Sequence, residues 1–329
     1  MKRALVLGAT GHIGAHVVRA LLVKGYAVRA AYRNPRYRVV LDGLPVETVQ
    51  LDLEDAQQLR TALDGCEFVF HCAGYYPRFT GRRPHAIARG IEQVHRVFDV
   101  FQHARQLQRI IYTSSAATIS SPLGGIATEQ DQEPWPLTSW RPLYATVKLA
   151  MEHTVMQYVQ AGLPIVIVNP SVCIGEYDAR PFSGRLVLLF ANGKLPFYID
   201  HQFNAVYTGD VDLGHVLAAE RGRVGERYLL VGQNLDVRAF ARLVAQQAGV
   251  RAPRWRVPQA MMIAVAVISE GIAAITRTEP LLSRQAIEFA QGGHRLDGTK
   301  ARHELGMPQT PVEEAIRRAL GWFQQHGYC

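Results

Sequence analysis

Residues 4–14 read Ala-Leu-Val-Leu-Gly-Ala-Thr-Gly-His-Ile-Gly, an apolar run that passes directly into a glycine-rich turn. The run Ala4–Leu7 is typical of a buried strand, and the residues after the turn have helical periodicity. Gly8 permits a tight turn, Gly11 lets the backbone approach a diphosphate, and Gly14 lets the helix pack on the strand. The helix N-terminus adds a positive dipole end. The stretch predicts a dinucleotide cradle, with an ordinary glycine turn as the alternative.

Strands and helices alternate regularly on either side of this motif. Further apolar runs bounded by Gly, Pro or Asp follow at Ala27–Tyr32, Glu47–Leu51, Phe68–Cys72, Arg109–Thr113 and Pro164–Val168. Helical patterns separate them at His12–Lys24, Ala56–Asp64, Ile91–Leu107 and Tyr144–Ala161. This alternation predicts an α/β fold with a doubly wound parallel sheet of the Rossmann type. Ligands in such sheets bind at the carboxyl ends of the strands.

The regular alternation ends after Pro170, and only the strand-like run Arg227–Val231 returns to it. We therefore expect an NAD(P)-binding domain formed by residues 1–172 together with about 205–235. The remaining residues, about 173–204 and 236–329, are expected to form a smaller, mostly helical substrate-binding region.

The composition is that of a globular protein with an excess of basic residues. The 329 residues carry a formal net charge of +8. Four arginines crowd one early stretch (Arg29, Arg33, Arg36 and Arg38), but no basic block is interleaved with aromatic residues as single-strand binders require. We expect an anionic cofactor rather than nucleic acid as the partner. The four scattered cysteines predict neither a disulfide framework nor a metal site, which favours a cytoplasmic protein with reduced thiols.

Met261–Ile275 is the most apolar stretch of the chain. It contains Glu270 and is shorter than the ~20 residues that a bilayer span needs, so no integral membrane span is predicted. We expect a buried helix here, with a helix lying on a membrane surface as the alternative.

The end of the second predicted strand bears on the choice between NAD and NADP. An acid at this place binds the ribose of NAD, whereas an arginine accommodates the 2′-phosphate of NADP. The chain has Tyr32 followed by Arg33, which favours NADP(H), leaves NAD(H) possible, and leaves a solvated surface arginine as the alternative. After the third strand, Asp52 and Leu53 are expected to face the adenine, although Asp52 could instead cap the helix beginning at Ala56.

Tyr144 and Lys148 lie four residues apart, which places a phenol and an ammonium one helical turn apart on one face. A nearby cation favours the phenolate, so the pair predicts an acid–base function, with an ordinary surface pair as the alternative. Ser115 ends the fifth predicted strand and is expected to polarise the substrate oxygen. Ser114 is the second choice because strand alternation points it to the opposite face, and an ordinary strand-end turn is the third reading.

Together these features resemble the extended short-chain dehydrogenase/reductase family. The features that carry the resemblance are Gly8–Gly14, Asp52-Leu53, His71-Cys72-Ala73-Gly74, Tyr112–Ser115, Tyr144–Lys148 and Asn169-Pro170-Ser171. The second half is similar to the dihydroflavonol-reductase-like branch, which includes proteins called hopanoid-associated sugar epimerases. The segments that carry this likeness are 193–200, 209–215 and 225–230.

The resemblance implies a Ser–Tyr–Lys mechanism with catalytic residues Ser115, Tyr144 and Lys148. It implies cofactor contacts by Gly8, Thr10, Gly11, His12, Ile13, Gly14, Arg33, Asp52, Leu53, Ala73, Gly74, Tyr144, Lys148, Pro170 and Val172. The substrate would be a small molecule held between the domains. The residues expected to line its pocket are Tyr75, Tyr76, Tyr177 and Arg180, with packing of the aromatic residues in the core as the alternative.

Two departures from the family pattern bear on the substrate. Ile91 stands where related enzymes often have an asparagine, and 201–204 reads His-Gln-Phe-Asn where sugar-nucleotide epimerases commonly have an arginine for the diphosphate. The missing arginine, together with Arg33, favours an NADPH-dependent ketone reductase. The overall family resemblance supports the alternative, an epimerase or dehydratase that acts on nucleoside-diphosphate sugars with a tightly held cofactor. Arg180, Arg185 or Lys194 could replace the missing arginine.

A catalytically silent NADP-sensing protein is a third possibility, which the intact Ser–Tyr–Lys set disfavours. We also expect a homodimer that pairs through the helices at Ile91–Leu107 and Tyr144–Ala161, because both carry apolar residues on more faces than one sheet contact requires.

Overall fold

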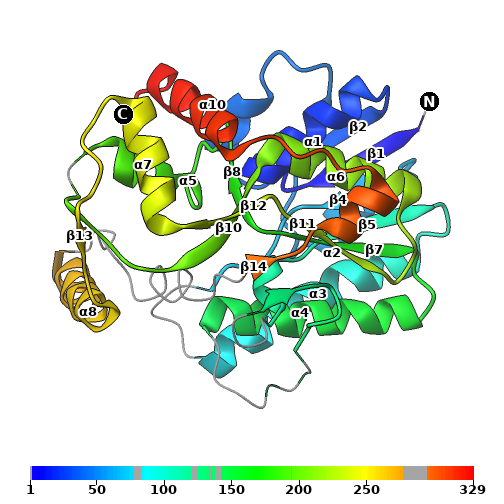
Figure 1. The fold of residues 1–329 in the computed structure, drawn as a ribbon. Coiled ribbons are helices and arrows are strands. Elements are labelled where there is room, and N and C mark those ends of the chain that lie inside the picture. Colours follow the sequence, from blue (N-terminus) through cyan, green and yellow to red (C-terminus); the bar gives the residue numbers. More distant parts are fainter. Residues whose placement is uncertain are drawn as a thin grey trace.

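A seven-stranded parallel sheet forms the centre of the computed structural model (Figure 1). The structure describes residues 2–77, 83–120, 125–133, 135, 137, 142–193, 195–276 and 295–329. The strands stand in the order β11-β7-β5-β4-β1-β2-β3. Their bounds are Arg227–Leu230 (β11), Ile165–Pro170 (β7), Arg109–Thr113 (β5), Phe68–His71 (β4), Arg3–Leu7 (β1), Ala27–Tyr32 (β2) and Glu47–Gln50 (β3).

The order of the strands reverses at β1, which lies between β2 and β4. The chain runs from β1 outward to β3 and then crosses back to β4, so the carboxyl ends of β1 and β4 diverge into a crevice where such sheets bind ligands. The sheet register pairs Leu7 with His71 and His71 with Tyr112, which brings three strand ends to one level. The doubly wound parallel fold expected from the sequence is confirmed.

Helices cover both faces of the sheet (Figure 1). The helices α1 (His12–Val23) and α6 (Thr208–Arg221) pack on one face around Val17, Leu21 and Val211. The opposite face carries α2 (Ala56–Leu63), α3 (Arg83–Gln102) and α4 (Leu143–Gln160). Two faces covered by helices explain why the strands have nearly continuous apolar sequences.

Most predicted strands and helices agree with the structure to within a few residues, whereas α3 begins eight residues before its predicted start at Ile91. Ala86 and Gly90 are buried in this additional part and continue the apolar face of the helix. At the other end, His103 and Ala104 donate backbone hydrogen bonds to Val100 and Phe101, so a turn replaces the predicted last part of the helix.

The surplus apolar faces of α3 and α4 meet each other within one chain. A Cβ added at Gly90 would lie 2.9 Å from Val147 Cγ1 and 3.1 Å from Met151 Cγ, so the two helices are in close contact. This packing accounts for the additional apolar residues from which a homodimer was expected. The homodimer therefore stays a prediction without that support.

The second half of the chain builds a smaller body beside the sheet. Its strands β8 (Val172–Ile174), β10 (Gln202–Tyr207) and β12 (Gln233–Asp236) form one sheet, and β9 (Phe197–Tyr198) pairs with β13 (Trp255–Arg256). A further strand, β14 (Arg295–Leu296), pairs with β6 (Ile126–Ala127) from the first half of the chain. The helices α5 (Gly184–Ala191), α7 (Val237–Ala248) and α10 (Val312–Gln325) enclose its core. Three short helices complete the description: η1 (Pro35–Leu41), η2 (Ala116–Thr118) and η3 (Ala301–Leu305).

Some residues assigned to the substrate region pack on the sheet domain. Ala301 and Leu305 of η3 belong to the core shared by α1 and α6. The domain bounds inferred from the sequence remain predictions.

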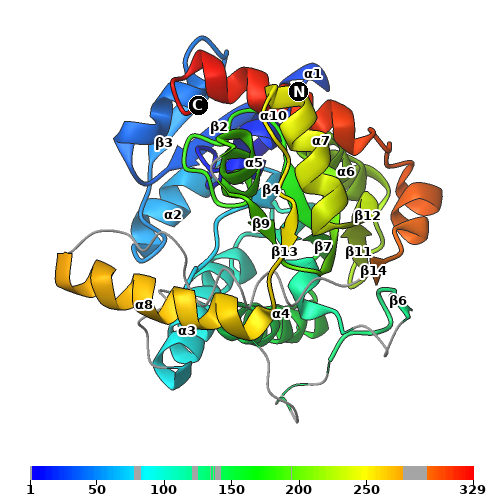
Figure 2. The ribbon, with the colours of Figure 1, turned by 60° about the vertical axis from the view of Figure 1, so that its left-hand side comes forward.

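The apolar segment from Met261 forms α8 (Gln259–Thr276), and the expectation that it is buried is wrong. Among residues 261–276, only Met262, Ala266 and Ala273 are buried. Figure 2 shows α8 as a long rod that extends at the left beyond the neighbouring helices. Amphipathic periodicity could not reveal this, because α8 is apolar on nearly every face. No helix among the described residues is long and apolar enough to cross a membrane.

Candidate active site

The glycine-rich turn after β1 forms a cradle that has no room for a side chain at two of its glycines. Gly8 has φ +78°, and a Cβ there would lie 2.9 Å from the backbone nitrogen of Ala73. A Cβ on Gly14 would lie 2.1 Å from the carbonyl oxygen of Gly8. Both positions therefore require glycine, one for its backbone conformation and the other for close packing.

The N-terminus of α1 has the electrostatics of an anion site. Gly11 precedes its first turn, which contains no acidic residue and receives no side-chain cap from the described part of the chain. Helix N-termini of this kind favour phosphate groups. The cradle therefore fits the diphosphate of a dinucleotide. Thr10 is half-buried beside it, and Ile13 packs on the core of the α1 face.

His12 lies in the first turn of α1 and contacts α6. Its Nε2 lies 3.0 Å from Thr208 Oγ1, and burial lowers the pKa of His12 to about 4. The imidazole is therefore neutral at physiological pH and contributes no positive charge to a phosphate site.

Arg33 and Asp52 lie at the far end of the cradle, where β2 and β3 end. The Arg33 side chain is exposed, and its carbonyl accepts a hydrogen bond from Gln50 Nε2 at 3.4 Å. Asp55, not Asp52, caps α2, because its carboxylate accepts hydrogen bonds from Gln57 and Gln58. The exposed Asp52 instead accepts a bond from the Glu54 backbone at 3.1 Å, and Leu53 packs toward the α2 and α3 core.

Ser115, Tyr144 and Lys148 come together at the carboxyl end of β5. Ser115 follows β5, and its hydroxyl lies beside the phenol of Tyr144, at the start of α4, where it opposes the rise in the pKa of that phenol. Lys148 lies one turn farther along α4, and its Nζ is 6.0 Å from the centre of the Tyr144 ring. The Ser114 hydroxyl contacts Glu152 instead, as the alternation of strand residues leads one to expect.

Burial acts on the two titratable groups in opposite directions. It raises the pKa of Tyr144 well above its ordinary value, and the neighbouring Tyr76 adds to the shift. It lowers the pKa of Lys148 to about 8, against the opposing effect of the Glu152 carboxylate. At neutral pH the site therefore holds a protonated phenol beside a largely charged ammonium.

Gly74 leaves the space that Lys148 occupies. A Cβ on Gly74 would lie 2.8 Å from Lys148 Nζ, closer than such contacts allow. A Cβ on Gly8 would lie 2.9 Å from the backbone nitrogen of Ala73. The turn after β4 therefore contacts both the cradle and Lys148. This turn links the two parts of the site.

Aromatic residues form one wall of the site. Tyr76 stacks on Tyr144, with ring centres 5.5 Å apart and an interplanar angle of 25°, and its other neighbour is Phe182 at 5.4 Å. Tyr75 packs toward the α3 and α4 core, while Pro170 is buried at the end of β7 and Val172 begins β8. Phe182 was missed because nothing in a lone aromatic residue of an irregular segment indicates its neighbours.

Two of the residues predicted to contact the substrate, Tyr177 and Arg180, are not part of this aromatic wall. Tyr177 packs away from the phenol of Tyr144, with its ring 3.7 Å from Arg19 Cζ and beside His16 and Trp322. Its φ of +62° places the residue in the left-handed region. Arg180 is exposed, and Lys194 lies outside the described residues.

Glu152 is a further residue of the site that the sequence analysis missed. Its fully buried carboxylate accepts hydrogen bonds from Ser114, Thr118 at 3.1 Å, Asn169 at 2.8 Å, Gln132 at 2.5 Å and Arg227 at 3.0 Å. The i+4 spacing from Lys148 is the one signal that the sequence offered. Within the described ranges, no group of three His, Cys, Asp or Glu side chains could hold a metal ion.

Comparison with known proteins agrees with this arrangement. The model of the NAD dependent epimerase/dehydratase family matches residues 4–230, which include the cradle, β5 and α4. The chain belongs to this family. The resemblance to extended short-chain dehydrogenases/reductases is thereby confirmed, and the family shows an NAD(P)-dependent enzyme.

Relatives within the epimerase/dehydratase family carry different names. Sterol demethylase protein B of Methylococcus capsulatus is 32% identical over 98% of both chains. A Synechocystis protein provisionally named dihydroflavonol 4-reductase is 31% identical over 98% of this chain and 95% of its own length. The crystal structure of a nucleoside-diphosphate-sugar epimerase from Pseudomonas aeruginosa has a TM-score of 0.80 at 29% identity and covers 99% of both chains.

Proposed function

We propose that this protein is an NADPH-dependent reductase that converts a ketone to a secondary alcohol. The observation that carries the proposal is the Ser115 hydroxyl beside the phenol of Tyr144, with Lys148 one turn farther along the helix that carries Tyr144. This arrangement places two hydroxyl donors at one point, where the oxygen of a carbonyl group would accept both.

The protonation state of Tyr144 favours reduction. Because burial raises its pKa, the phenol keeps its proton at neutral pH and is ready to donate it. Bound NADPH would supply the hydride to the carbonyl carbon. Tyr144 would transfer its proton to the carbonyl oxygen while the Ser115 hydroxyl stabilises the developing negative charge, which gives the alcohol.

Lys148 would support this proton transfer electrostatically. A cation close to Tyr144 stabilises the phenolate that remains after donation, and with a pKa of about 8 the lysine is largely charged at neutral pH. The space left by Gly74 sets where the ammonium lies.

Arg33 supports NADPH over NADH. Its exposed side chain follows β2, where the 2′-phosphate of NADP lies in folds of this type. Asp52 is not engaged in capping α2, so it remains available for the adenine as proposed from the sequence.

The aromatic wall supports an apolar cyclic substrate. Tyr76 and Phe182 are both about half exposed and lie beside Tyr144. One relative is named for a sterol and another for a dihydroflavonol, and both names denote polycyclic molecules. Asn204 stands in the segment where epimerases commonly have an arginine, and it is buried in hydrogen bonds to Ser171 and Asn234.

A nucleoside-diphosphate-sugar epimerase is the second candidate, favoured by the similarity to a solved structure of that name. The two functions differ in what happens to the cofactor. A reductase consumes NADPH with each turnover, whereas an epimerase returns the hydride and shows no net consumption.

The decisive experiment follows NADPH absorbance during incubation of the purified protein with a panel of sterol-like and flavonoid-like ketones. Multiple turnovers that are lost in Tyr144→Phe would support the reductase. No consumption with any ketone, together with epimerisation of a nucleotide sugar, would replace it by the second candidate. Cofactor binding without either reaction would favour an NADP sensor.

We also propose that the protein works in the cytoplasm as a homodimer. Free thiols at Cys66, Cys72, Cys173 and Cys329 agree with a reducing compartment. Closed two-fold dimers are the most common soluble homo-oligomers. Light scattering at micromolar concentration tests the dimer, and a monomer mass would contradict it.

A further inference from the structure

The helix α8 exposes a continuous apolar stripe. Met261, Val265, Ile268, Ile272 and Ile275 recur at the spacing of one helix face, and their exposed fractions lie between 44% and 85%. Ile263 and Val267 widen the stripe and are exposed by 39% and 47%. Such a surface is uncommon on a monomeric soluble protein and marks an interaction site.

Among the residues that the structure describes, α8 is held along one narrow edge. Met262 and Ala266 pack against Phe197 and Ile199 near β9 and against Val257 after β13. Ala273 is buried farther along the same edge. The stripe therefore faces outward while its helix stays anchored to the strand pair.

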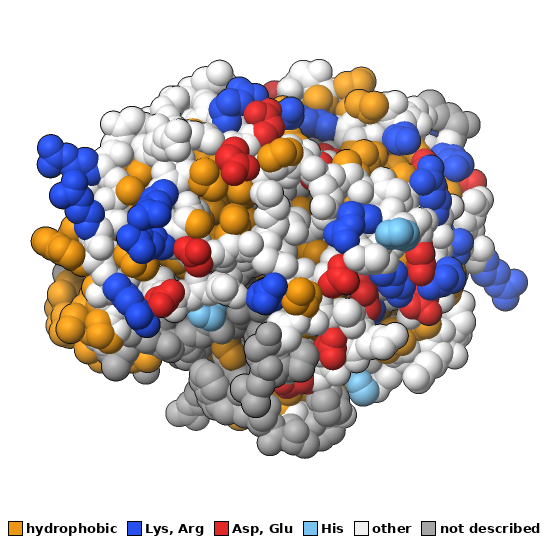
Figure 3. Space-filling view, viewed as in Figure 1, with side chains coloured by type: hydrophobic (Ala, Val, Ile, Leu, Met, Phe, Trp, Pro, Cys, Tyr) orange, Lys and Arg blue, Asp and Glu red, His pale blue; other side chains and the backbone are white. Residues whose placement is uncertain are grey.

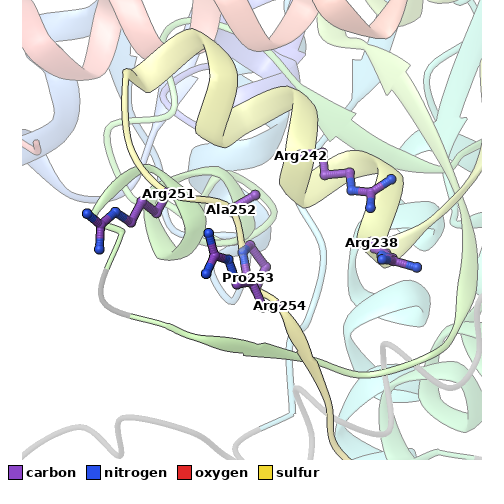
Figure 4. A pocket seen from close by; sticks show the side chains of 6 residues that line it. All are labelled: Arg238, Arg242, Arg251, Ala252, Pro253 and Arg254. Atoms are coloured by element: carbon purple, nitrogen blue, oxygen red, sulfur yellow. The ribbon is translucent and has the colours of Figure 1, made fainter.

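Arginines gather beside this anchor. Arg251 and Arg254 lie just before β13, and together with Arg238 and Arg242 of α7 they line a cavity of about 400 Å³ (Figure 4). All four are exposed, and none has an ion-pair partner among the described carboxylates. Figure 3 shows basic side chains next to apolar ones at the left edge of the molecule, where Figure 1 places α8 and β13.

Trp255 lies between these two features in the sequence and is 69% exposed. Tryptophan is enriched at the boundary between the lipid headgroups and the hydrocarbon, since its ring is apolar and its N–H is polar. An apolar helix face, an exposed tryptophan and several unpaired arginines are the features of proteins that lie on anionic membranes.

We propose that α8 and the neighbouring arginines, Arg238, Arg242, Arg251 and Arg254, dock this protein on the surface of an anionic phospholipid membrane. The stripe would enter the headgroup region parallel to the surface, and the arginines would bind lipid phosphates. The proposal does not rest on the proposed reductase activity.

A second copy of the chain fits this surface less well. In a two-fold dimer the same patch lies on both sides, so the interface would contain both arginine clusters. Near the stripe, Asp200 already pairs with Arg256 at 3.1 Å, and Glu270 is the one acidic residue of α8. Phosphate groups complement the positive charge better than this patch complements itself.

The test is co-sedimentation of the full chain with vesicles of phosphatidylcholine, with and without phosphatidylglycerol. We expect binding at least ~10-fold tighter to the anionic vesicles and weakened by salt. The double variant Ile268→Asp with Ile272→Asp should lose at least ~10-fold in binding, because a charge replaces apolar surface in the headgroup region. Val23→Asp with Val39→Asp, which also changes exposed valines but in α1 and η1, is the matched control.

A second pair of variants tests the arginines. Arg251→Ser with Arg254→Ser should weaken anionic binding by roughly 25-fold, about fivefold for each arginine. Arg251→Lys with Arg254→Lys keeps the charge and should bind nearly as the wild type does.

Three results would overturn the proposal. In the first, the wild type stays in the supernatant with both kinds of vesicle. In the second, it binds neutral and anionic vesicles equally well. In the third, the aspartate double variant binds as tightly as the wild type. A dimer mass that falls to a monomer mass in that variant, without vesicle binding by the wild type, would assign the stripe to a second copy.

Discussion

The buried carboxylate of Glu152 accepts a hydrogen bond from Arg227 Nε at 3.0 Å and thereby joins α4 to the outermost strand of the sheet, β11. The glutamate side chain has no exposed surface, and the arginine side chain is 20% exposed. Because the same carboxylate also binds Ser114 and Asn169, one charge ties the catalytic helix to three strand ends.

Removing Arg227 should be costly, since Glu152 would keep a buried charge without its ionic partner. We expect Arg227→Met to lower the free energy of unfolding by about 3 kcal/mol, measured by urea denaturation. The control is Arg223→Met, which breaks the solvent-exposed pair with Glu304 and should cost at most about 1 kcal/mol. Equal losses in the two variants would show that burial of Glu152 does not decide the effect.

Tyr144→Phe tests the proton donor. We expect turnover to fall by at least ~100-fold while the dissociation constant for the cofactor stays nearly unchanged, because the phenol is lost and the ring remains. Tyr26→Phe is a matched control, as its buried hydroxyl has no hydrogen-bond partner among the described residues. Near-normal turnover of Tyr144→Phe would remove this tyrosine from the mechanism.

Lys148→Met should impair both turnover and cofactor affinity, because the lysine is proposed to stabilise the phenolate and is expected from the family resemblance to contact the cofactor. Single-turnover rates and cofactor titration would separate the two effects. A variant that binds the cofactor as the wild type does would limit the lysine to its effect on Tyr144.

Arg33→Asp tests cofactor choice. A charge-assisted contact with the 2′-phosphate is worth ~1.5–3 kcal/mol, or roughly 10- to 150-fold in affinity, and the exposure of Arg33 favours the lower end. The variant should prefer NADH in fluorescence titrations with both cofactors. Arg36→Asp changes the net charge equally and should leave the preference intact. Wild type that binds both cofactors alike would refute the assignment and favour the epimerase.

His71→Phe tests the response to acid. Burial lowers the pKa of His71 to about 3, its Nδ1 has no described partner, and its ring stacks on Phe98. Between pH 3 and 6.5 the unfolded chain therefore binds the additional proton, so stability falls as the pH falls through this range.

We expect wild type to lose about 2 kcal/mol more than His71→Phe between pH 7 and pH 5. Comparing each protein with itself at two pH values removes the packing difference between the two rings. His103→Phe, at an exposed position, should follow the wild type. Parallel pH curves for wild type and His71→Phe would contradict the burial argument.

Much of the sheet domain could be predicted because its signals are local. The bounds of β2 and β5 agree with the predicted ones, and the glycine positions follow from turn geometry that neighbouring residues determine. The order of the motifs along the chain then indicated the strand ends where Ser115 and Tyr144 meet. Each inference needed only short stretches of sequence and the rules of parallel sheets.

The remaining features depend on contacts between distant residues. Nothing near Tyr177 in the sequence indicates that its ring turns toward Arg19, and the five partners of Glu152 come from four separate segments. The exposure of α8 was missed for a different reason: apolar composition measures the tendency to leave water, but not what covers the helix.

The network around Glu152 has a consequence for how the enzyme could adapt to different substrates. Sequence neighbours of Ser115 bind the carboxylate of Glu152, which lies on the same helix as Tyr144, so this half of the site is held rigidly to the protein interior. The opposite half, Tyr76 and Phe182, consists of partly exposed rings in irregular segments. Substrate range should therefore evolve on the aromatic side, where the rings are not tied to the Glu152 network.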